Sequence, residues 1–347
     1  MTRTLRSFSR LAVAAVALAA PAALFAADAD AAEVNLYSAR KEELIRPMLD
    51  EFTKETGIKV NVLTADADQL VERIKSEGAN SPADVLMTVD AGRLYRAKQE
   101  GILQAIDSQV LEAAVPAHLQ DKDNEWFGLS QRARVVFYAK DRVKPEELST
   151  YEDLASDKWK GRICIRSSGN IYNLSMMAAM IAHHGEEKAK EWADGMVNNL
   201  ARAPQGGDRD QIKAVAAGEC DLAISNTYYV VGMLASKDEA EAKAAQAVSV
   251  FFPNQQTTGT HVNVSGAGVV KNAPNKADAV KLLEWLAGEK AQAMYAEVNG
   301  EYPVVAGVPW GETLKAWGEF KMDELPMDNL GEYNAAATKV FDQTGWR

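Results

Sequence analysis

The chain alternates strand-type and helix-type segments, and this alternation restricts its fold more than any other feature of the sequence. Short apolar runs typical of buried strands lie at 33–37, 58–63 and 84–88. Segments with apolar residues at helical spacing separate them, at 42–56, near 70–74 and at 92–100. Because parallel strands need a long crossover connection, usually an α-helix, this order predicts a parallel α/β sheet covered by helices.

The rest of the chain continues the pattern. Strand-type runs lie at 126–138, 162–166, 220–225 and 262–270, and helical patterns lie at 172–183, 211–217 and 276–287. The 347 residues suffice for two domains of roughly 100–200 residues each, and no flexible linker separates two halves. We therefore expect the chain to cross between two α/β lobes in extended hinge segments, near 126–138 and 249–261. A cleft that closes about this hinge is the expected ligand site.

Charge and motif content restrict the function. The net charge of −11 argues against nucleic acid as a partner, because a phosphate backbone requires basic patches. The sequence has no Gly-x-Ser-x-Gly elbow, no Walker loop and no zinc-type histidine cluster. The isolated pair Gly206 and Gly207 carries no specific signal. We therefore expect a binding protein and not an enzyme.

The N-terminal residues 1–31 are typical of a cleaved signal peptide. An apolar stretch at 11–25 follows three arginines, Arg3, Arg6 and Arg10. Three positions fit the small-residue cleavage pattern: Ala26, Ala29 and Ala31. The apolar stretch is shorter than the 18 or more residues of a membrane-spanning helix, and no cysteine near the cleavage sites would carry a lipid anchor. The protein is therefore expected to be exported.

Two cysteines remain, Cys164 and Cys220, and both lie in strand-type runs. In an oxidising compartment such a pair can form a disulfide, and two adjacent buried thiols are the alternative. Neither cysteine has a Cys-x-x-Cys partner or a histidine at metal-ligand spacing, so the sequence does not favour a metal site at this pair.

Five segments together resemble one family. They are 34–40 (VNLYSAR), 159–164 (WKGRIC), 167–173 (SSGNIYN), 226–229 (NTYY) and 261–268 (HVNVSGAG). In this order they resemble the periplasmic ferric-ion-binding proteins of ABC transporters, and the resemblance extends over nearly the whole mature chain. The combination is much more specific than any one segment.

The resemblance implies a type II periplasmic binding protein fold, in which two α/β lobes, each a mixed sheet flanked by helices, are joined by two crossing hinge strands. Residues 32–128 and 262–305 are then expected to form the first lobe, and 129–261 and 306–347 the second. It further implies a periplasmic monomer that binds ferric iron and delivers it to an ABC permease in the inner membrane.

In that family tyrosine oxygens hold the iron, often with a carbonate-like anion, and the matching positions are Tyr172, Tyr228 and Tyr229. Phenolate suits Fe³⁺ because a small, hard ion favours anionic oxygen donors. The alternative for the adjacent pair is that one ring belongs to the core, since neighbours on a strand face opposite sides. Both rings can reach one ion only if the chain turns or enters a helix there, and Asn226 and Thr227 are plausible capping residues.

The sequence departs from the family at Lys41 and Glu42, where many relatives carry a His-Tyr pair that supplies ligands from the first lobe. This departure indicates the subgroup that uses three tyrosines with an anion or water, with Glu42 nearby.

The expected anion, carbonate or bicarbonate, requires a positive partner. Arg132 and Arg134 alternate in a β-type run and should face the same side. They are either solvated or part of a cleft, where a guanidinium donates two parallel hydrogen bonds to carbonate. We favour Arg132, with Arg134, Arg40 and Ser38 as further candidates. The alternative function is a receptor for an anion, a polyamine or a thiamine-like ligand on the same fold.

Overall fold

The computed structural model describes residues 32–347, and the predicted signal peptide lies outside them. The strands are β1 (Glu33–Ser38), β2 (Lys59–Thr64), β3 (Val85–Thr88), β4 (Phe127–Ala139), β5 (Ile163–Cys164), β6 (Leu222–Asn226), β7 (Val248–Phe251) and β8 (Val262–Val269). The helices are α1 (Glu42–Thr56), α2 (Ala67–Glu77), α3 (Ala91–Gln99), α4 (Gln109–Ala114), α5 (Ile171–His184), α6 (Glu186–Asn198), α7 (Asp208–Ala217), α8 (Thr227–Leu234), α9 (Glu239–Gln246), α10 (Lys276–Leu286), α11 (Glu289–Asn299), α12 (Glu312–Trp317), α13 (Asp328–Glu332) and α14 (Asn334–Thr344).

The strands form a mixed sheet in the order β2-β1-β3-β8-β4-β6-β5, with β7 also paired to β4. The β1–β2, β1–β3 and β5–β6 pairs are parallel, whereas every pair that involves β4 or β8 is antiparallel. The parallel arrangement expected from the β-α-β order of residues 33–100 is present in β1, β2 and β3. The sheet as a whole is mixed, as the resemblance implies, because β4 and β8 run antiparallel to their neighbours.

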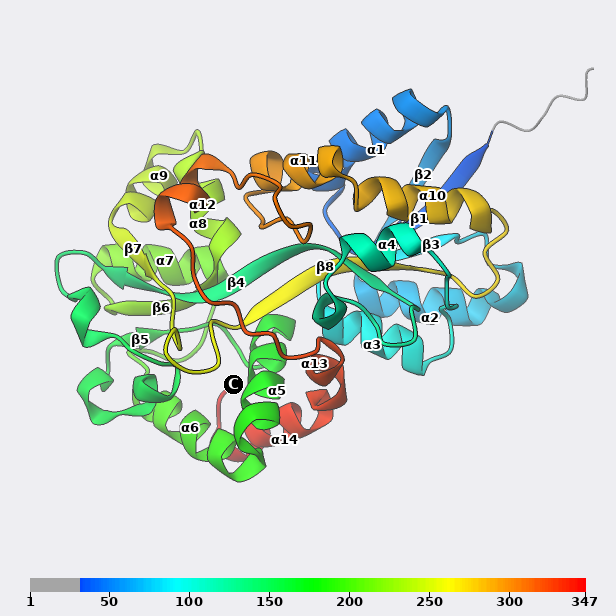
Figure 1. Ribbon diagram of the computed structural model, residues 1–347. Coiled ribbons are helices and arrows are strands. Elements are labelled where there is room, and N and C mark those ends of the chain that lie inside the picture. Colours follow the sequence, from blue (N-terminus) through cyan, green and yellow to red (C-terminus); the bar gives the residue numbers. More distant parts are fainter. Residues whose placement is uncertain (1–31) are drawn as a thin grey trace, which may run out of the picture. The chain divides into compact units, whose positions relative to one another are not determined.

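The long strand β4 belongs to both halves of the sheet. Its first part, from Phe127 to Ala133, pairs with β8, and its second part, from Arg134 onward, pairs with β6 and β7. Figure 1 shows β4 and β8 lying side by side between the two groups of helices. Two α/β lobes joined by crossing strands, as the resemblance implies, are therefore present.

Two glycines in β8 allow the close approach of its neighbour. A Cβ atom at Gly266 would lie 2.5 Å from the carbonyl oxygen of Phe127, and one at Gly268 would lie 2.4 Å from that of Glu125. Both distances are far below van der Waals contact, so only glycine permits this packing of β8 against the beginning of β4. The glycines of the run 261–268 are thus explained by the crossing of the two strands.

The C-terminal helices secure the second lobe. Helix α14 packs against α5 and α6, and a separate apolar cluster there includes Trp159, Trp192, Phe341 and Trp346. Helix α13 packs against both α3 and α5. Across the described residues, none of the helices combines the length and the apolar character that crossing a membrane requires.

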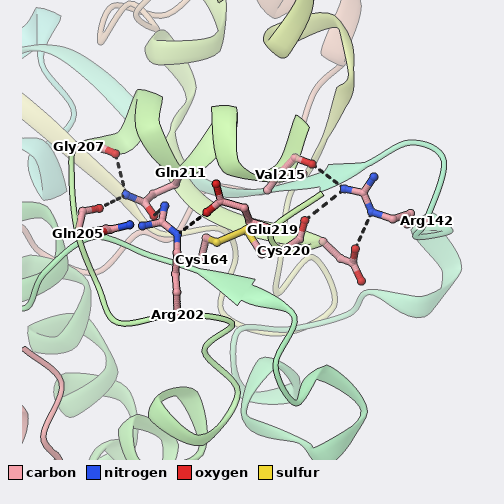
Figure 2. The surroundings of a disulfide bond; sticks show 10 residues. Arg142, Cys164, Arg202, Gln205, Gly207, Gln211, Val215, Glu219 and Cys220 are labelled. Carbon is pink, nitrogen blue, oxygen red and sulfur yellow. Dashed lines mark hydrogen bonds and ion pairs between the residues drawn. A yellow bond between two sulfur atoms is a disulfide. The ribbon is translucent and has the colours of Figure 1, made fainter. Parts of the chain in front are cut away.

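Cys164 and Cys220 form a disulfide, which decides between the two possibilities that the sequence left open. Their Cα atoms lie 5.9 Å apart, and both residues are buried. The bond joins the end of β5 to the segment before β6. Figure 2 shows it beside α7, with the Arg142 side chain donating to the carbonyl oxygen of Cys220. It therefore connects the two strands that lead to α5 and α8.

Candidate functional site

A cleft of about 720 Å³ contains the three predicted tyrosines and residues from both lobes. Its charged and phenolic lining residues are Arg40, Lys41, Glu43, Arg132, Arg166, Tyr172, Asp208, Arg209, Asp210, Lys213, Tyr228, Tyr229, Glu241 and Glu301. The first-lobe side is formed by the loop after β1 and the beginning of α1, and the second-lobe side by the beginnings of α5, α7 and α8. The cleft thus lies where three second-lobe helices begin.

Tyr172 lies in the first turn of α5. Asn170 caps this helix, because its side-chain oxygen accepts the backbone N–H of Tyr172 over 3.1 Å. The Asn173 amide, in the same turn, donates to the carbonyl oxygens of Arg166 and Ser167, over 2.9 Å in each case. These contacts hold the polar turn before α5 in place and leave the phenol of Tyr172 half-buried at the cleft.

Tyr228 and Tyr229 lie in the first turn of α8, which begins at Thr227. Adjacent helical residues are about 100° apart and not opposite as on a strand, so both rings can face the cleft. Their ring centroids lie 4.3 Å apart, and the Tyr228 hydroxyl donates to the Tyr172 hydroxyl over 3.2 Å. The helix start required by the adjacent pair is therefore present, and phenols from α5 and α8 meet.

Asn226 occupies the N-cap position of α8, but its side chain does not cap the helix. Its Oδ1 instead accepts a hydrogen bond from Arg134 Nη1 over 3.0 Å. The capping role expected for Asn226 is therefore wrong, although the position of the helix start is right. A buried guanidinium competes successfully for the amide oxygen, because hydrogen bonds to ionised groups are stronger than neutral ones.

The surroundings of the tyrosines oppose their ionisation. Burial, together with the neighbouring Tyr172 and Tyr229, raises the pKa of Tyr228 well above its ordinary value. Burial, with Tyr172 and Asp208 nearby, raises the pKa of Tyr229 to about 12. Without a cation in the cleft, both phenols therefore keep their protons at neutral pH.

Arg132 is buried at the base of the cleft, with its guanidinium 6.0 Å from the centroid of the Tyr228 ring. Its Nη2 donates to Ser265 Oγ over 2.6 Å and lies 3.4 Å from Glu301 Oε1. The Nε and Nη1 atoms have no partner among residues 32–347. Because buried donors are rarely left unpaired, these two N–H groups are available for an oxygen-rich anion.

Arg40 is the neighbour of Arg132 in the cleft and is already paired. Its Nη2 lies 2.6 Å from Glu301 Oε2, and its Nη1 donates to Ser265 Oγ over 2.9 Å. Glu301 also accepts the Ser130 hydroxyl over 2.8 Å. Although burial opposes ionisation of Glu301, Arg40 and Arg132 hold its pKa below the ordinary value. One carboxylate thus faces two guanidinium groups, and this corner keeps one uncompensated positive charge.

Arg134 is buried as well, but the protein itself satisfies most of its donors. It donates to Asp208 over 3.0 Å, to Asn226 over 3.0 Å and to Asn173 over 2.6 Å. Asp208 also pairs with Arg166 at 2.5 Å. The alternative of two solvated arginines is wrong, since both are only 2% exposed. Through these bonds Arg134 connects the beginnings of α5, α7 and α8. It does not line the cleft.

Two further predicted residues lie elsewhere. The Ser38 hydroxyl accepts the backbone N–H of Arg40 over 3.1 Å, and so stabilises its own turn. Glu42 is exposed, pairs with Arg46 one turn later in α1, and is not among the residues that line the cleft. Glu43 and Lys41 line the cleft instead, because the helix begins at Glu42 and rotates its side chain away.

Sequence reasoning missed Glu301, Asp208 and Arg166. Glu301 follows α11 and is 261 residues away from Arg40 along the chain. Asp208 opens α7, where an acidic residue is unremarkable because it complements the helix dipole. No local pattern marks either carboxylate as an arginine partner. The signal that could have found them is the need of buried arginines for counter-charges.

Comparison with known proteins identifies the family. Residues 47–322 match the family described as bacterial extracellular solute-binding protein. The chain belongs to this family. The solute-binding protein is 54% identical over 315 residues to iron uptake protein A1 of Synechocystis sp., a match that covers 91% of this chain and 88% of the relative. It is 28% identical over 333 residues to the major ferric iron-binding protein of Neisseria meningitidis serogroup B, covering 94% and 97%.

Among solved structures, the solute-binding protein is similar to FutA (IdiA) of Trichodesmium in complex with iron and citrate ligands. The TM-score is 0.89 and the identity 53%, and the match covers 91% of this chain and 100% of that one. The predicted family and the two-lobed fold are therefore confirmed. The family is one of solute-binding proteins, and these relatives are an iron uptake protein and a ferric iron-binding protein, so the solute-binding protein is not an enzyme, as predicted.

Proposed function

We propose that this protein binds ferric iron in the cleft through Tyr172, Tyr228 and Tyr229, together with a carbonate or bicarbonate ion at Arg132. The observation that carries the proposal is the hydrogen bond between phenols of α5 and α8, beside a buried guanidinium that has two nitrogens without a partner in the described part of the chain. Neither feature helps the protein without a ligand, because clustered phenols resist ionisation and unpaired buried N–H groups cost stability.

The charges of this arrangement suit a trivalent ion. Three phenolates would balance the charge of Fe³⁺, and the positive charge at Arg132 would balance a bound anion. A trivalent ion would also favour the phenolate form of these tyrosines, since coordination stabilises the deprotonated ligand and releases its proton. Arg132 is suited to an anion because its Nε and Nη1 donors have no partner in the described chain, and hydrogen bonds from a charged guanidinium to an anion are strong.

The relatives support iron as the cargo. One is an iron uptake protein, a second is a ferric iron-binding protein, and the Trichodesmium protein was solved with iron and citrate ligands. A relative from Serratia marcescens, 27% identical over 300 residues, is an Fe(3+)-binding periplasmic protein. We infer that this chain is exported to the periplasm and delivers iron as a monomer to an ABC permease of the inner membrane.

Iron capture would be coupled to closure of the lobes. We assign 32–128 and 262–305 to the first lobe and 129–261 and 306–347 to the second, with hinges near 126–138 and 249–261. The continuous β4 strand, which pairs with β8 in one half and with β6 and β7 in the other, supports this assignment. Bending at its middle would change the distance between the loop after β1 and the tyrosines.

A visible-absorption titration of the iron-stripped protein with chelated Fe³⁺, with and without bicarbonate, tests the proposal. Tyrosinate-to-iron charge transfer should colour the complex, and the colour should be lost or greatly weakened in Tyr228→Phe and Tyr229→Phe proteins. Tyr333→Phe, a half-buried tyrosine outside the cleft, is the matched control. Colour that does not depend on bicarbonate would remove the anion from the proposal, and absence of colour at stoichiometric iron would refute the tyrosinate site.

A further inference from the structure

A buried carboxylate outside the cleft connects both lobes and the crossing strands. Asp90 precedes α3 and caps it, since its Oδ1 accepts the backbone N–H of Gly92 over 2.8 Å. Its Oδ2 accepts two side-chain donors, Ser175 Oγ over 2.8 Å and Asn263 Nδ2 over 2.7 Å. All three side chains are at least nine-tenths buried. Asp90 is therefore held by donors from α3, α5 and β8 at once.

The geometry of this junction is well defined. The side-chain Oδ1 of Asn263 accepts the backbone N–H of Ala91 over 3.0 Å and that of Val264 over 2.8 Å. These two bonds leave only the amide nitrogen to face Asp90. Burial raises the pKa of Asp90, while the Ser175 hydroxyl and the nearby Arg132 oppose that rise. A buried carboxyl group of this kind is costly unless its hydrogen bonds are satisfied, so its retention calls for a role.

Ser175 is the partner that shares a helix with a tyrosine of the cleft. It lies one turn after Tyr172 in α5, and its hydroxyl donates to Asp90. Serine in the middle of a helix commonly bonds back to the carbonyl oxygen four residues earlier, which weakens or bends the helix. Here the Ser175 hydroxyl instead donates to Asp90, in the other lobe. The first two turns of α5 are thus tied to the first lobe by Ser175 and to the second lobe by Asn173, which accepts a hydrogen bond from Arg134.

We propose that Asp90 and Ser175 are a positioning pair for Tyr172. Their hydrogen bond sets the place of the first turn of α5 relative to the first lobe, and therefore the place of the Tyr172 oxygen relative to Arg132 and any bound anion. Tyr228 and Tyr229 are placed differently, because α8 packs on α7, α9, β4 and β6. The inference rests on the proposed role of Tyr172 as an iron ligand.

Ser175→Ala is the decisive variant. It removes one donor and leaves Asp90 with Gly92 and Asn263, so the fold is retained. Ser225→Ala is the matched control, because Ser225 is a fully buried serine of the second lobe whose hydroxyl has no partner in the described chain. We expect Ser175→Ala to lower iron affinity by about tenfold, the lower end of the range for partners that orient a metal ligand. Ser225→Ala should leave iron affinity unchanged.

A double-mutant cycle distinguishes positioning from general damage. If Ser175 acts through Tyr172, Ser175→Ala should cause no further loss of iron affinity in a Tyr172→Phe background, but its full loss in a Tyr229→Phe background. Equal losses in both backgrounds, or wild-type affinity in Ser175→Ala alone, would overturn the inference. Asp90→Asn is the second variant and should follow the same pattern.

An iron-free readout separates this inference from the proposed function. In protein labelled with ¹³C at the tyrosine ring carbon that bears the hydroxyl, Tyr172→Phe assigns the Tyr172 signal. We expect that signal to shift in Ser175→Ala protein and not in Ser225→Ala protein. A shift without any iron-dependent colour in the wild type would support the positioning pair while refuting the iron site. An unmoved signal would refute the pair even if iron binds.

Discussion

The Tyr228 hydroxyl donates a hydrogen bond to the Tyr172 hydroxyl over 3.2 Å, which joins the beginnings of two helices that are 56 residues apart in sequence. A metal ion bound to both oxygens, as proposed, would have to displace the proton of this hydrogen bond. This exchange would determine how the proposed site responds to pH.

Iron binding should release protons and weaken in acid. Since the pKa of Tyr228 is well above its ordinary value and that of Tyr229 is about 12, both phenols are protonated at neutral pH in the iron-free protein. Each proton released raises the apparent association constant about tenfold per pH unit. Calorimetry in buffers of different ionisation enthalpy should detect about two or more protons released per iron. Binding without proton release would contradict phenolate ligands.

The iron-free protein should lose stability in alkali. The folded state raises the pKa of Tyr229 to about 12, whereas tyrosine in an unfolded chain titrates near 10. Between these values the folded protein holds a proton that the unfolded chain has lost, so the free energy of unfolding falls as pH rises from about 10 towards 12. Urea unfolding across this range should show a smaller decline in Tyr229→Phe protein. An identical decline would mean that Tyr229 does not titrate as described.

Arg132→Lys should separate anion binding from iron binding. Lysine keeps the positive charge but loses the planar fork that fits carbonate, so the stimulation of iron binding by bicarbonate should be strongly reduced. Iron-stripped variant protein should still unfold cooperatively, because Glu301 keeps its bonds to Arg40 and Ser130. Titrations at several bicarbonate concentrations measure the effect. Wild-type bicarbonate dependence in the variant would move the anion away from Arg132.

Loss of Asp208 should destabilise the second lobe. Asp208 is fully buried between Arg134 and Arg166, so Asp208→Ala leaves two guanidinium groups without their counter-charge and should cost about 3–5 kcal/mol. Glu42→Ala removes an exposed partner of Arg46 in α1 and should cost no more than about 0.5 kcal/mol. Urea unfolding compares the two variants. Similar costs would show that the buried network contributes little.

Removal of the disulfide should lower stability through the unfolded state. Cys164 and Cys220 are 56 residues apart, and a cross-link that closes a loop of this size contributes about 4 kcal/mol in the chain-entropy model. The double variant with alanine at both positions should unfold at correspondingly lower urea concentration. As a check, the wild type denatured without reductant should show no free thiol. Two reactive thiols would mean that the bond does not form in the purified protein.

Much of the fold was predictable because it is encoded locally. The strand run 126–138 and the helical run 172–183 agree with β4 and α5 to within a residue or two at each end. Apolar periodicity specifies such elements without knowledge of their neighbours. The antiparallel pairing of β4 with β8 was not predictable from the β-α-β order. That pairing depends on which strands meet in space. Its clearest sign in the sequence is the pair Gly266 and Gly268, which allow β8 to approach the beginning of β4.

The candidate site, like the fold, could be predicted from the sequence only in part. The three tyrosines could be named from short motifs, and Asn226 was correctly placed at the start of a helix. The roles of the arginines could not be assigned from sequence. Arg132 and Arg134 are equivalent in the pattern, two residues apart on one face of β4. Only their partners distinguish them, and those partners lie far away along the chain.

The sequence by itself determined the order of strands and helices, the family, and the presence of three phenols at the beginnings of helices. The tertiary structure decided which groups remain free to bind. Glu301 pairs with Arg40, and Asp208 pairs with Arg134, whereas Arg132, beside Tyr228, has two nitrogens without a partner among residues 32–347. The physical reason is that periodicity and capping are properties of neighbouring residues. The pairing of buried charges depends instead on side chains that only the folded chain brings within hydrogen-bonding distance.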